Sequence, residues 1–186
     1  DLHAGQIQGF FDIPVDNLFT TPLFARYIKK KLKNKKLICV SPDVGGVQRT
    51  RGLATKIKAD LAIIDKRRPR PGKSKVMNII GNVKGKTCII VDDIIDSGGT
   101  IVNAVDALKK NGATEVYVFI THAVLSGDAA SKIKKSKIKK LIITDTIDNS
   151  QKIKNNNKIE VLSISSLMAE AIKRISNSTS VSDLFN

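Results

Sequence analysis

The sequence predicts an α/β fold, a parallel twisted sheet with flanking helices, for this chain of 186 residues. Short apolar segments alternate with segments of helical pattern along the whole chain, which is the order that a parallel sheet with crossover helices requires. The apolar segments are rich in Ile, Val and Leu, as are strands that are buried on both faces. Apolar residues make up 41% of the chain, which is enough to bury a core although Trp is absent.

Apolar runs predict the strands of the first half of the chain. A helical pattern covers residues 46–58, and the segment GNVKGK at residues 81–86 is typical of a turn. The predicted strands span residues 37–40, 61–65, 76–80 and 87–91.

The second half begins with a predicted helix at residues 100–111, which Gly112 ends in the position where a glycine closes many helices. A closing helix is predicted at residues 165–175, with Ser165 or Ser166 as its N-cap. The remaining predicted elements are strands at residues 116–121, 141–144 and 160–164 and a low-complexity surface loop at residues 152–158.

The two cysteines lie in apolar runs, Cys39 in LICV and Cys88 in TCIIV. We therefore expect two small buried residues in adjacent strands, rather than a disulfide framework or a zinc site, in a reducing, cytoplasmic environment. No segment approaches the roughly 20 apolar residues that span a bilayer, so we expect no membrane association. The chain opens on Asp1 rather than Met, and we expect it to be part of a longer protein.

The chain has 32 Lys and Arg residues against 17 Asp and Glu residues, a formal net charge of +15. This excess could reflect nucleic-acid binding, attraction of polyanionic small substrates, or a compositional bias towards Lys, Asn and Ile. The lysines at residues 29–36 and 132–140 lack the interleaved aromatic residues that single-strand binders use. The pattern favours bias together with phosphate attraction over nucleic-acid binding.

One stretch, VDDIIDSGGT at residues 91–100, has the composition of a phosphate and sugar site. Asp92 and Asp93 follow a predicted buried strand, and their carboxylates can accept hydrogen bonds from sugar hydroxyls or hold a cation. The segment from Asp96 through Ser97, Gly98, Gly99 and Thr100 then leads into a helix, whose free N–H groups favour a phosphate. A simple strand-to-helix turn capped by Asp is the alternative. The stretch resembles the phosphoribosyl-binding loop of the type I phosphoribosyltransferase fold, which indicates the ligand class but not the reaction.

Three further stretches resemble ribose-phosphate pyrophosphokinases. They are DLHAGQIQGFFDIPVD at residues 1–16, SPDVGGVQR at residues 41–49 and DKRRPRPGKSKVMNIIG at residues 65–81. The resemblance extends through THAVLSG at residues 121–127 to SVSDLF at residues 180–185.

The resemblance implies the roles of individual residues. His3 and Asp43 would coordinate the Mg²⁺ bound to the ATP phosphates. Lys66 and Arg68 would stabilise the transition state, and Arg68 would also contact substrate. The residues implied to bind ribose 5-phosphate are Asp92, Asp93, Asp96, Ser97, Gly98, Gly99 and Thr100.

The implied reaction transfers the β,γ-diphosphoryl group of Mg-ATP to the C1 hydroxyl of ribose 5-phosphate, giving phosphoribosyl pyrophosphate and AMP for nucleotide biosynthesis. Residues 1–20 would end an N-terminal half of the family chain, and residues 21–186 would form the C-terminal phosphoribosyltransferase-like domain. We expect a homo-oligomer, since the family forms hexamers, and we expect the chain by itself to be inactive. A non-catalytic regulatory subunit and, with less support, a nucleic-acid-binding protein stay open as alternatives.

Overall fold

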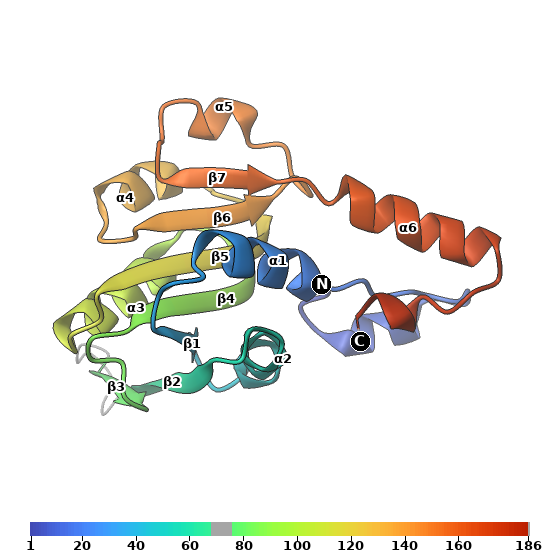
Figure 1. Cartoon of the computed structure of the whole chain (residues 1–186). Coiled ribbons are helices and arrows are strands. Elements are labelled where there is room, and N and C mark those ends of the chain that lie inside the picture. The colour runs from blue at the N-terminus through green and yellow to red at the C-terminus, as the bar shows by residue number, and fades with distance from the viewer. Residues whose placement is uncertain (68–75, 186) are drawn as a thin grey trace.

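The computed structural model describes residues 1–67 and 76–185. Its centre is a seven-stranded sheet in the order β3-β2-β1-β4-β5-β6-β7 (Figure 1). Neighbouring strands are parallel except β2 and β3, which are antiparallel. The predicted fold class is therefore confirmed, with one antiparallel strand at an edge. The strands are β1 (Leu37–Ser41), β2 (Asp60–Arg67), β3 (Val76–Ile80), β4 (Thr87–Ile95), β5 (Glu115–Ala123), β6 (Lys140–Thr144) and β7 (Ile159–Leu162).

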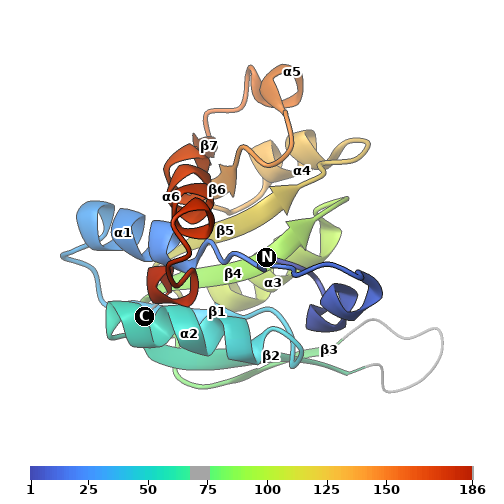
Figure 2. The same cartoon turned by 90° about the vertical axis from the view of Figure 1, so that its right-hand side faces the viewer.

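Helices cover both faces of this sheet, and α6 extends away from it (Figures 1 and 2). On one face, Phe24 and Leu53 pack in a cluster with Phe119, and all three are fully buried. On the other, Val105 packs in a separate cluster with Val118. Each such side chain contributes about 1.5–3 kcal/mol by leaving water. The helices are α1 (Thr21–Lys31), α2 (Val47–Ile57), α3 (Gly99–Lys110), α4 (Ala129–Lys135), α5 (Ser150–Ile153) and α6 (Ser165–Ser176), with short 3₁₀ helices η1 (Gly5–Phe10) and η2 (Ser182–Leu184).

Two helices, α1 and α4, carry little sequence signal. Their lysine-rich C-terminal halves resemble solvent-exposed loops, yet Phe24 and Ile28 of α1 are fully buried. In α4, Ala129 and Ile133 are fully buried one turn apart. These narrow apolar stripes become recognisable only once the sheet face that they cover is known.

Two local predictions are wrong. Strand β4 does not end at Val91 but continues to Ile95, because its pairing with β5 extends along the strand. Ser165 and Ser166 do not cap α6: the N-cap residue is Ile164, whose amide donates to Asp145 at 2.8 Å.

The asparagine-lysine run at residues 152–158 forms the predicted loop at residues 154–158, whereas its first two residues belong to α5. Its Asn156 is buried and donates to the carbonyl oxygen of Ala130 at 2.7 Å. Cys39 and Cys88 are fully buried in the neighbouring strands β1 and β4, as predicted. Across the described residues, no helix combines the length and apolar character needed to cross a bilayer.

The order of the strands reverses between β1 and β4. From β1 the chain moves outwards to β2 and β3, and it then returns to place β4 on the other side of β1. The carboxyl ends of β1 and β4 therefore diverge into connections on opposite faces, which leaves a crevice between them. This crevice is where ligands bind in open α/β sheets.

Candidate functional site

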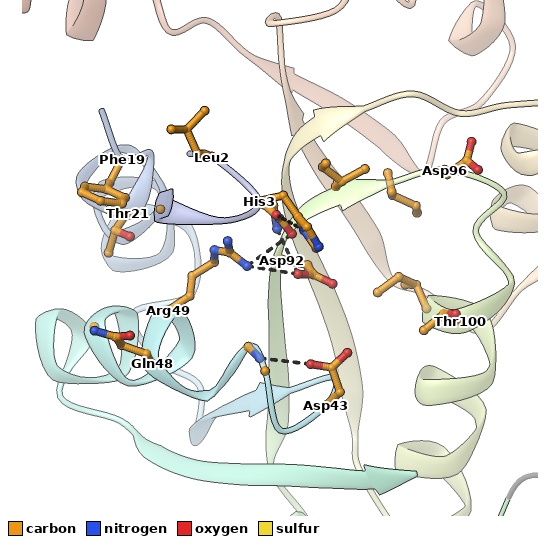
Figure 3. Close-up of a pocket in the computed structure, with 18 of the residues that line it drawn as sticks. Leu2, His3, Phe19, Thr21, Asp43, Gln48, Arg49, Asp92, Asp96 and Thr100 are labelled. Carbon is orange, nitrogen blue, oxygen red and sulfur yellow. Dashed lines mark hydrogen bonds and ion pairs between the residues drawn. The ribbon is translucent and has the colours of Figure 1, made fainter. Parts of the chain in front are cut away.

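A pocket of about 970 Å³ opens at this reversal point (Figure 3). Its walls come from the N-terminal segment, from the connection between β1 and α2, and from the end of β4 with the start of α3. Most of the residues predicted to form a site line it together, although they are far apart in the sequence. They are His3, Asp43, Asp92, Asp93, Asp96, Ser97, Gly98 and Thr100.

The loop at Asp96 to Thr100 joins β4 to α3. Gly98 has a φ of +75°, the left-handed region that residues with a Cβ seldom adopt. Its carbonyl oxygen accepts the amide of Val102 at 3.0 Å, and Gly99 is the first residue of α3. Asp96 and Thr100 are exposed at the rim. The loop thus places the N-terminus of α3 at the pocket. The free N–H groups at a helix N-terminus favour the binding of a dianion.

Asp92 and Asp93 lie within β4 rather than beyond its end. The amide of Asp93 donates to Oδ1 of Asp92 at 3.0 Å, and Nη1 of Arg49 donates to that same oxygen at 3.2 Å. Nη1 of Arg49 also lies 3.3 Å from Oδ1 of Asp93. One guanidinium from α2 therefore pairs with two adjacent carboxylates and reduces their mutual repulsion within a strand, where aspartate is disfavoured.

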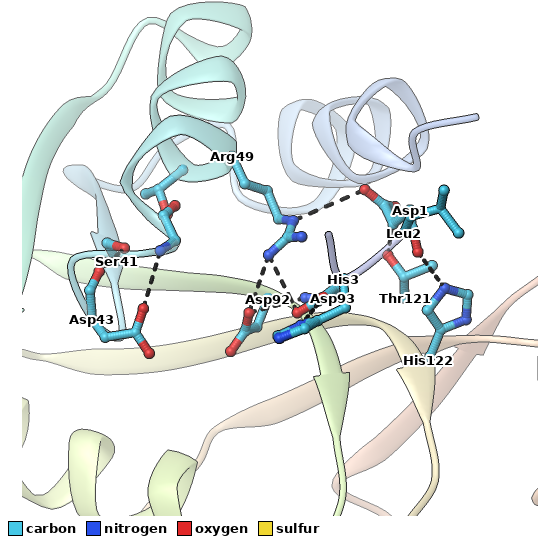
Figure 4. A network of polar contacts seen from close by, with 12 residues as sticks. Asp1, Leu2, His3, Ser41, Asp43, Arg49, Asp92, Asp93, Thr121 and His122 are labelled. Atoms are coloured by element: carbon cyan, nitrogen blue, oxygen red, sulfur yellow. Dashed lines mark hydrogen bonds and ion pairs between the residues drawn. The ribbon is translucent and has the colours of Figure 1, made fainter. Parts of the chain in front are cut away.

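Asp93 is buried and joins this pair to the N-terminal segment. Its Oδ2 accepts a hydrogen bond from Nδ1 of His3 at 2.7 Å (Figure 4). The His3 side chain itself is 76% exposed. Because Nδ1 is held by a carboxylate, Nε2 is the ring nitrogen that could contact a ligand, the arrangement common among metal-ligating histidines.

The two carboxylates differ in pKa. Burial, reinforced by the hydrogen bond and negative charge of Asp93, raises the pKa of Asp92 to about 7. Burial opposes ionisation of Asp93 as well, but hydrogen bonds from Asp92 and His3 and the charge of Arg49 lower its pKa. The pair therefore carries a negative charge centred on Asp93, while Asp92 titrates near neutrality.

Asp43 follows β1 and occupies the opposite wall of the pocket. Its Oδ1 accepts the amide of Gly46 at 3.0 Å, and its carbonyl oxygen accepts the Ser41 hydroxyl at 2.6 Å. Within residues 1–67 and 76–185, no three His, Cys, Asp or Glu side chains gather as metal ligands. His3 and Asp43 would therefore give a cation at most part of its shell, so phosphate oxygens and water would have to complete it.

Asp1 holds the N-terminal segment against the sheet. Its carboxylate is 3% exposed and accepts hydrogen bonds from the Thr20 amide at 3.0 Å and from the Thr20 and Thr121 hydroxyls, each at 2.7 Å. His122 bonds to the carbonyl oxygen of Asp1 at 2.7 Å. These contacts fix the segment that carries His3.

The two proposed catalytic residues cannot be placed in the pocket. The backbone of Lys66 pairs with Met77 at the end of β2, but its side chain lies outside the described part of the structure. Arg68 lies entirely outside the described residues. Sequence reasoning missed the central role of Arg49 and the contact of His122, although both residues belong to stretches that mark the site, SPDVGGVQR and THAVLSG.

Known proteins resemble this chain in sequence and in structure. The family model described as the phosphoribosyl synthetase-associated domain matches residues 48–186. The ribose-phosphate pyrophosphokinase of Bradyrhizobium diazoefficiens is 58% identical over 186 residues, covering 100% of this chain and 59% of that protein. The one from Mesorhizobium japonicum is 57% identical, with 100% of this chain and 60% of that protein covered.

A solved structure agrees with these matches. The phosphoribosylpyrophosphate synthetase from Mycobacterium smegmatis superimposes with a TM-score of 0.87 and 37% identity, over 96% of this chain and 57% of that one. The chain thus spans 59–60% of the length of the two curated relatives described above.

Proposed function

The chain belongs to the ribose-phosphate pyrophosphokinase family, and on that premise we propose that it carries the ribose 5-phosphate site of a ribose-phosphate diphosphokinase. The observation that supports this proposal most is that the loop at residues 96–100 and the carboxylate of Asp92 line the same pocket. One ligand that carries a phosphate and a sugar diol could contact both features at once.

In the proposed reaction the C1 hydroxyl oxygen of ribose 5-phosphate attacks the β-phosphorus of ATP. The bond between that phosphorus and the α,β-bridging oxygen breaks, and AMP leaves with this oxygen. The hydroxyl proton is released, and the product is phosphoribosyl pyrophosphate.

The substrate would be held at two points. The 5-phosphate would accept hydrogen bonds from the first amides of α3 and from the hydroxyls of Ser97 and Thr100, with Gly98 and Gly99 allowing close approach. Asp96 would orient this loop. Asp92 would accept hydrogen bonds from the ribose hydroxyls. Asp93 would act indirectly, through its contacts with Arg49 and His3.

The ATP side would use residues on the other wall of the pocket. We propose that His3 and Asp43 hold Mg²⁺, which would offset the charge of the ATP phosphates. Lys66 and Arg68 would contact the transferring phosphoryl oxygens, as a point charge and as a planar fork, respectively. The division at residue 20, assembly into a homo-oligomer and a cytoplasmic location stay predictions.

Calorimetric titration of the 186-residue chain with ribose 5-phosphate and Mg²⁺ tests the substrate assignment. Ribose 5-phosphate should bind more tightly than either inorganic phosphate or ribose, because it alone reaches both the loop and Asp92. Equal affinities for ribose 5-phosphate and inorganic phosphate would leave only a phosphate-binding loop and would contradict the proposed sugar contact.

A further inference from the structure

Arg49 is the one guanidinium, within the described residues, whose recorded ion pairs reach three different carboxylates. Nη1 lies 3.2 Å from Asp92 and 3.3 Å from Asp93, and Nε lies 3.9 Å from Oδ1 of Asp1 (Figure 4). Arg49 thereby connects α2, β4 and the N-terminal segment.

Two of these three carboxylates are rigidly held. The Asp93 side chain is 4% exposed and has His3 on its other oxygen, and the Asp1 side chain is 3% exposed. Asp92 is different, because its side chain is 22% exposed and lines the pocket. Arg49 thus donates to the buried Asp93 and to the accessible Asp92, while the buried Asp1 adds a more distant ion pair.

The orientation of Asp92 depends on this contact with Arg49. Successive side chains in a strand point to opposite faces, yet Asp92 and Asp93 reach the same nitrogen of Arg49. The Asp93 amide and Arg49 both donate to Oδ1 of Asp92, so two donors on one oxygen set the direction of the carboxylate. Without Arg49, only the Asp93 amide would hold the Asp92 carboxylate against repulsion from the Asp93 carboxylate.

We infer that Arg49 is a positioning residue, which holds the Asp92 carboxylate in place for the ribose hydroxyls and does not itself bind the 5-phosphate. This inference rests on the proposed function. A direct phosphate contact is disfavoured because a phosphate at Arg49 would face the negative charge of the carboxylates that already pair with Nη1 and would compete with them for this nitrogen.

Titration of Arg49→Met with ribose 5-phosphate and with inorganic phosphate distinguishes a positioning role from a direct phosphate contact. Loss of a charge-assisted contact should weaken ribose 5-phosphate binding by about tenfold or more, while inorganic phosphate should bind as it does to the unaltered chain. Arg51→Met is the matched control, because Arg51 is an exposed residue of the same helix and the substitution removes the same charge. Equal weakening of both ligands, or equal effects of the two substitutions, would overturn the inference.

A double-mutant cycle with Asp92→Asn tests whether Arg49 acts through Asp92. Once the Asp92 carboxylate is gone, Arg49→Met should weaken ribose 5-phosphate binding by less than about twofold more. Additive losses would show that Arg49 acts independently and would overturn the positioning role. If Arg49→Met does not fold, Arg49→Lys replaces it: a point charge lacks the planar fork, so the same selective loss is expected in smaller measure.

The same titrations distinguish this inference from the proposed function. If the unaltered chain binds no ribose 5-phosphate, the proposed function fails and the inference fails with it. If the unaltered chain binds ribose 5-phosphate and Arg49→Met binds it equally well, only the inference fails.

Discussion

Oδ2 of Asp93 lies 2.7 Å from Nδ1 of His3, a contact between residues 90 positions apart. It joins the centre of the sheet to the N-terminal segment, and Asp1 anchors the same segment to β5. One wall of the site is thus built from a segment that contributes no strand to the sheet.

We predict that Gly98→Ala weakens phosphate binding. A Cβ at Gly98 would have ordinary van der Waals room, since its nearest neighbour is Cβ of Ala129 at 3.8 Å, but the φ of +75° would be strained. The cost should be about 1–2 kcal/mol of stability, or a shift of the loop that relieves it. Thermal unfolding and titration with inorganic phosphate measure the two effects.

Gly85→Ala provides the control for this substitution. Gly85 has a φ of +70° in a turn before β4, and nothing lies within 4 Å of a Cβ there. It should lose similar stability and keep full phosphate affinity. Equal loss of phosphate affinity in both variants would mean that backbone strain acts globally and that the loop has no special role.

We predict that Asp92 makes the folded chain less stable as the pH rises towards neutrality. Its pKa is raised from an ordinary 3.8 to about 7, so the folded chain binds this proton more tightly than the unfolded chain does. The resulting stabilisation is complete below about pH 4 and is lost as the pH approaches about 7. The lowered pKa of Asp93 acts only below that window.

Chemical denaturation across this pH range measures the effect. Asp92→Asn should remove the part of the pH dependence that falls between about pH 4 and pH 7. An unchanged pH dependence in the variant would assign the titration to another group.

Much of this site follows from the sequence, because the loop at residues 96–100 and the strand-end position of Asp43 are local features. The exact ending of β4 does not. Local propensity ends the strand before two aspartates, whereas pairing with β5 and the charge of Arg49, 43 positions away from Asp92, favour its continuation. His3 is likewise predicted as a ligand from resemblance, but its partner Asp93 appears only in the folded chain.

We predict opposite effects for two aspartates of the pocket. Asp43→Asn should weaken the retention of Mn²⁺ in the presence of ATP, followed by electron paramagnetic resonance, because an amide is a poorer ligand for a hard cation than a carboxylate. It should leave ribose 5-phosphate binding within about twofold, given that such effects are usually independent at separate sites. Asp96→Asn should show the reverse pattern.

Each variant is titrated with both ligands, so that an effect on one ligand can be compared with the effect on the other. If both substitutions weakened both ligands equally, the two walls of the pocket would not divide the substrates as proposed. Unfolding curves of the two variants exclude a shared loss of structure as the cause.

The last prediction concerns turnover by the chain of 186 residues. The matched relatives are longer, with 59–60% of their length covered, and we propose that residues in their remaining part complete the ATP site. The chain should therefore bind ribose 5-phosphate but release little AMP when ATP and Mg²⁺ are supplied. A coupled assay for AMP measures this, with Asp92→Asn as the control for background hydrolysis. Robust AMP release that Asp92→Asn abolishes would place a complete catalytic site within these residues and would contradict the proposed division of the substrates.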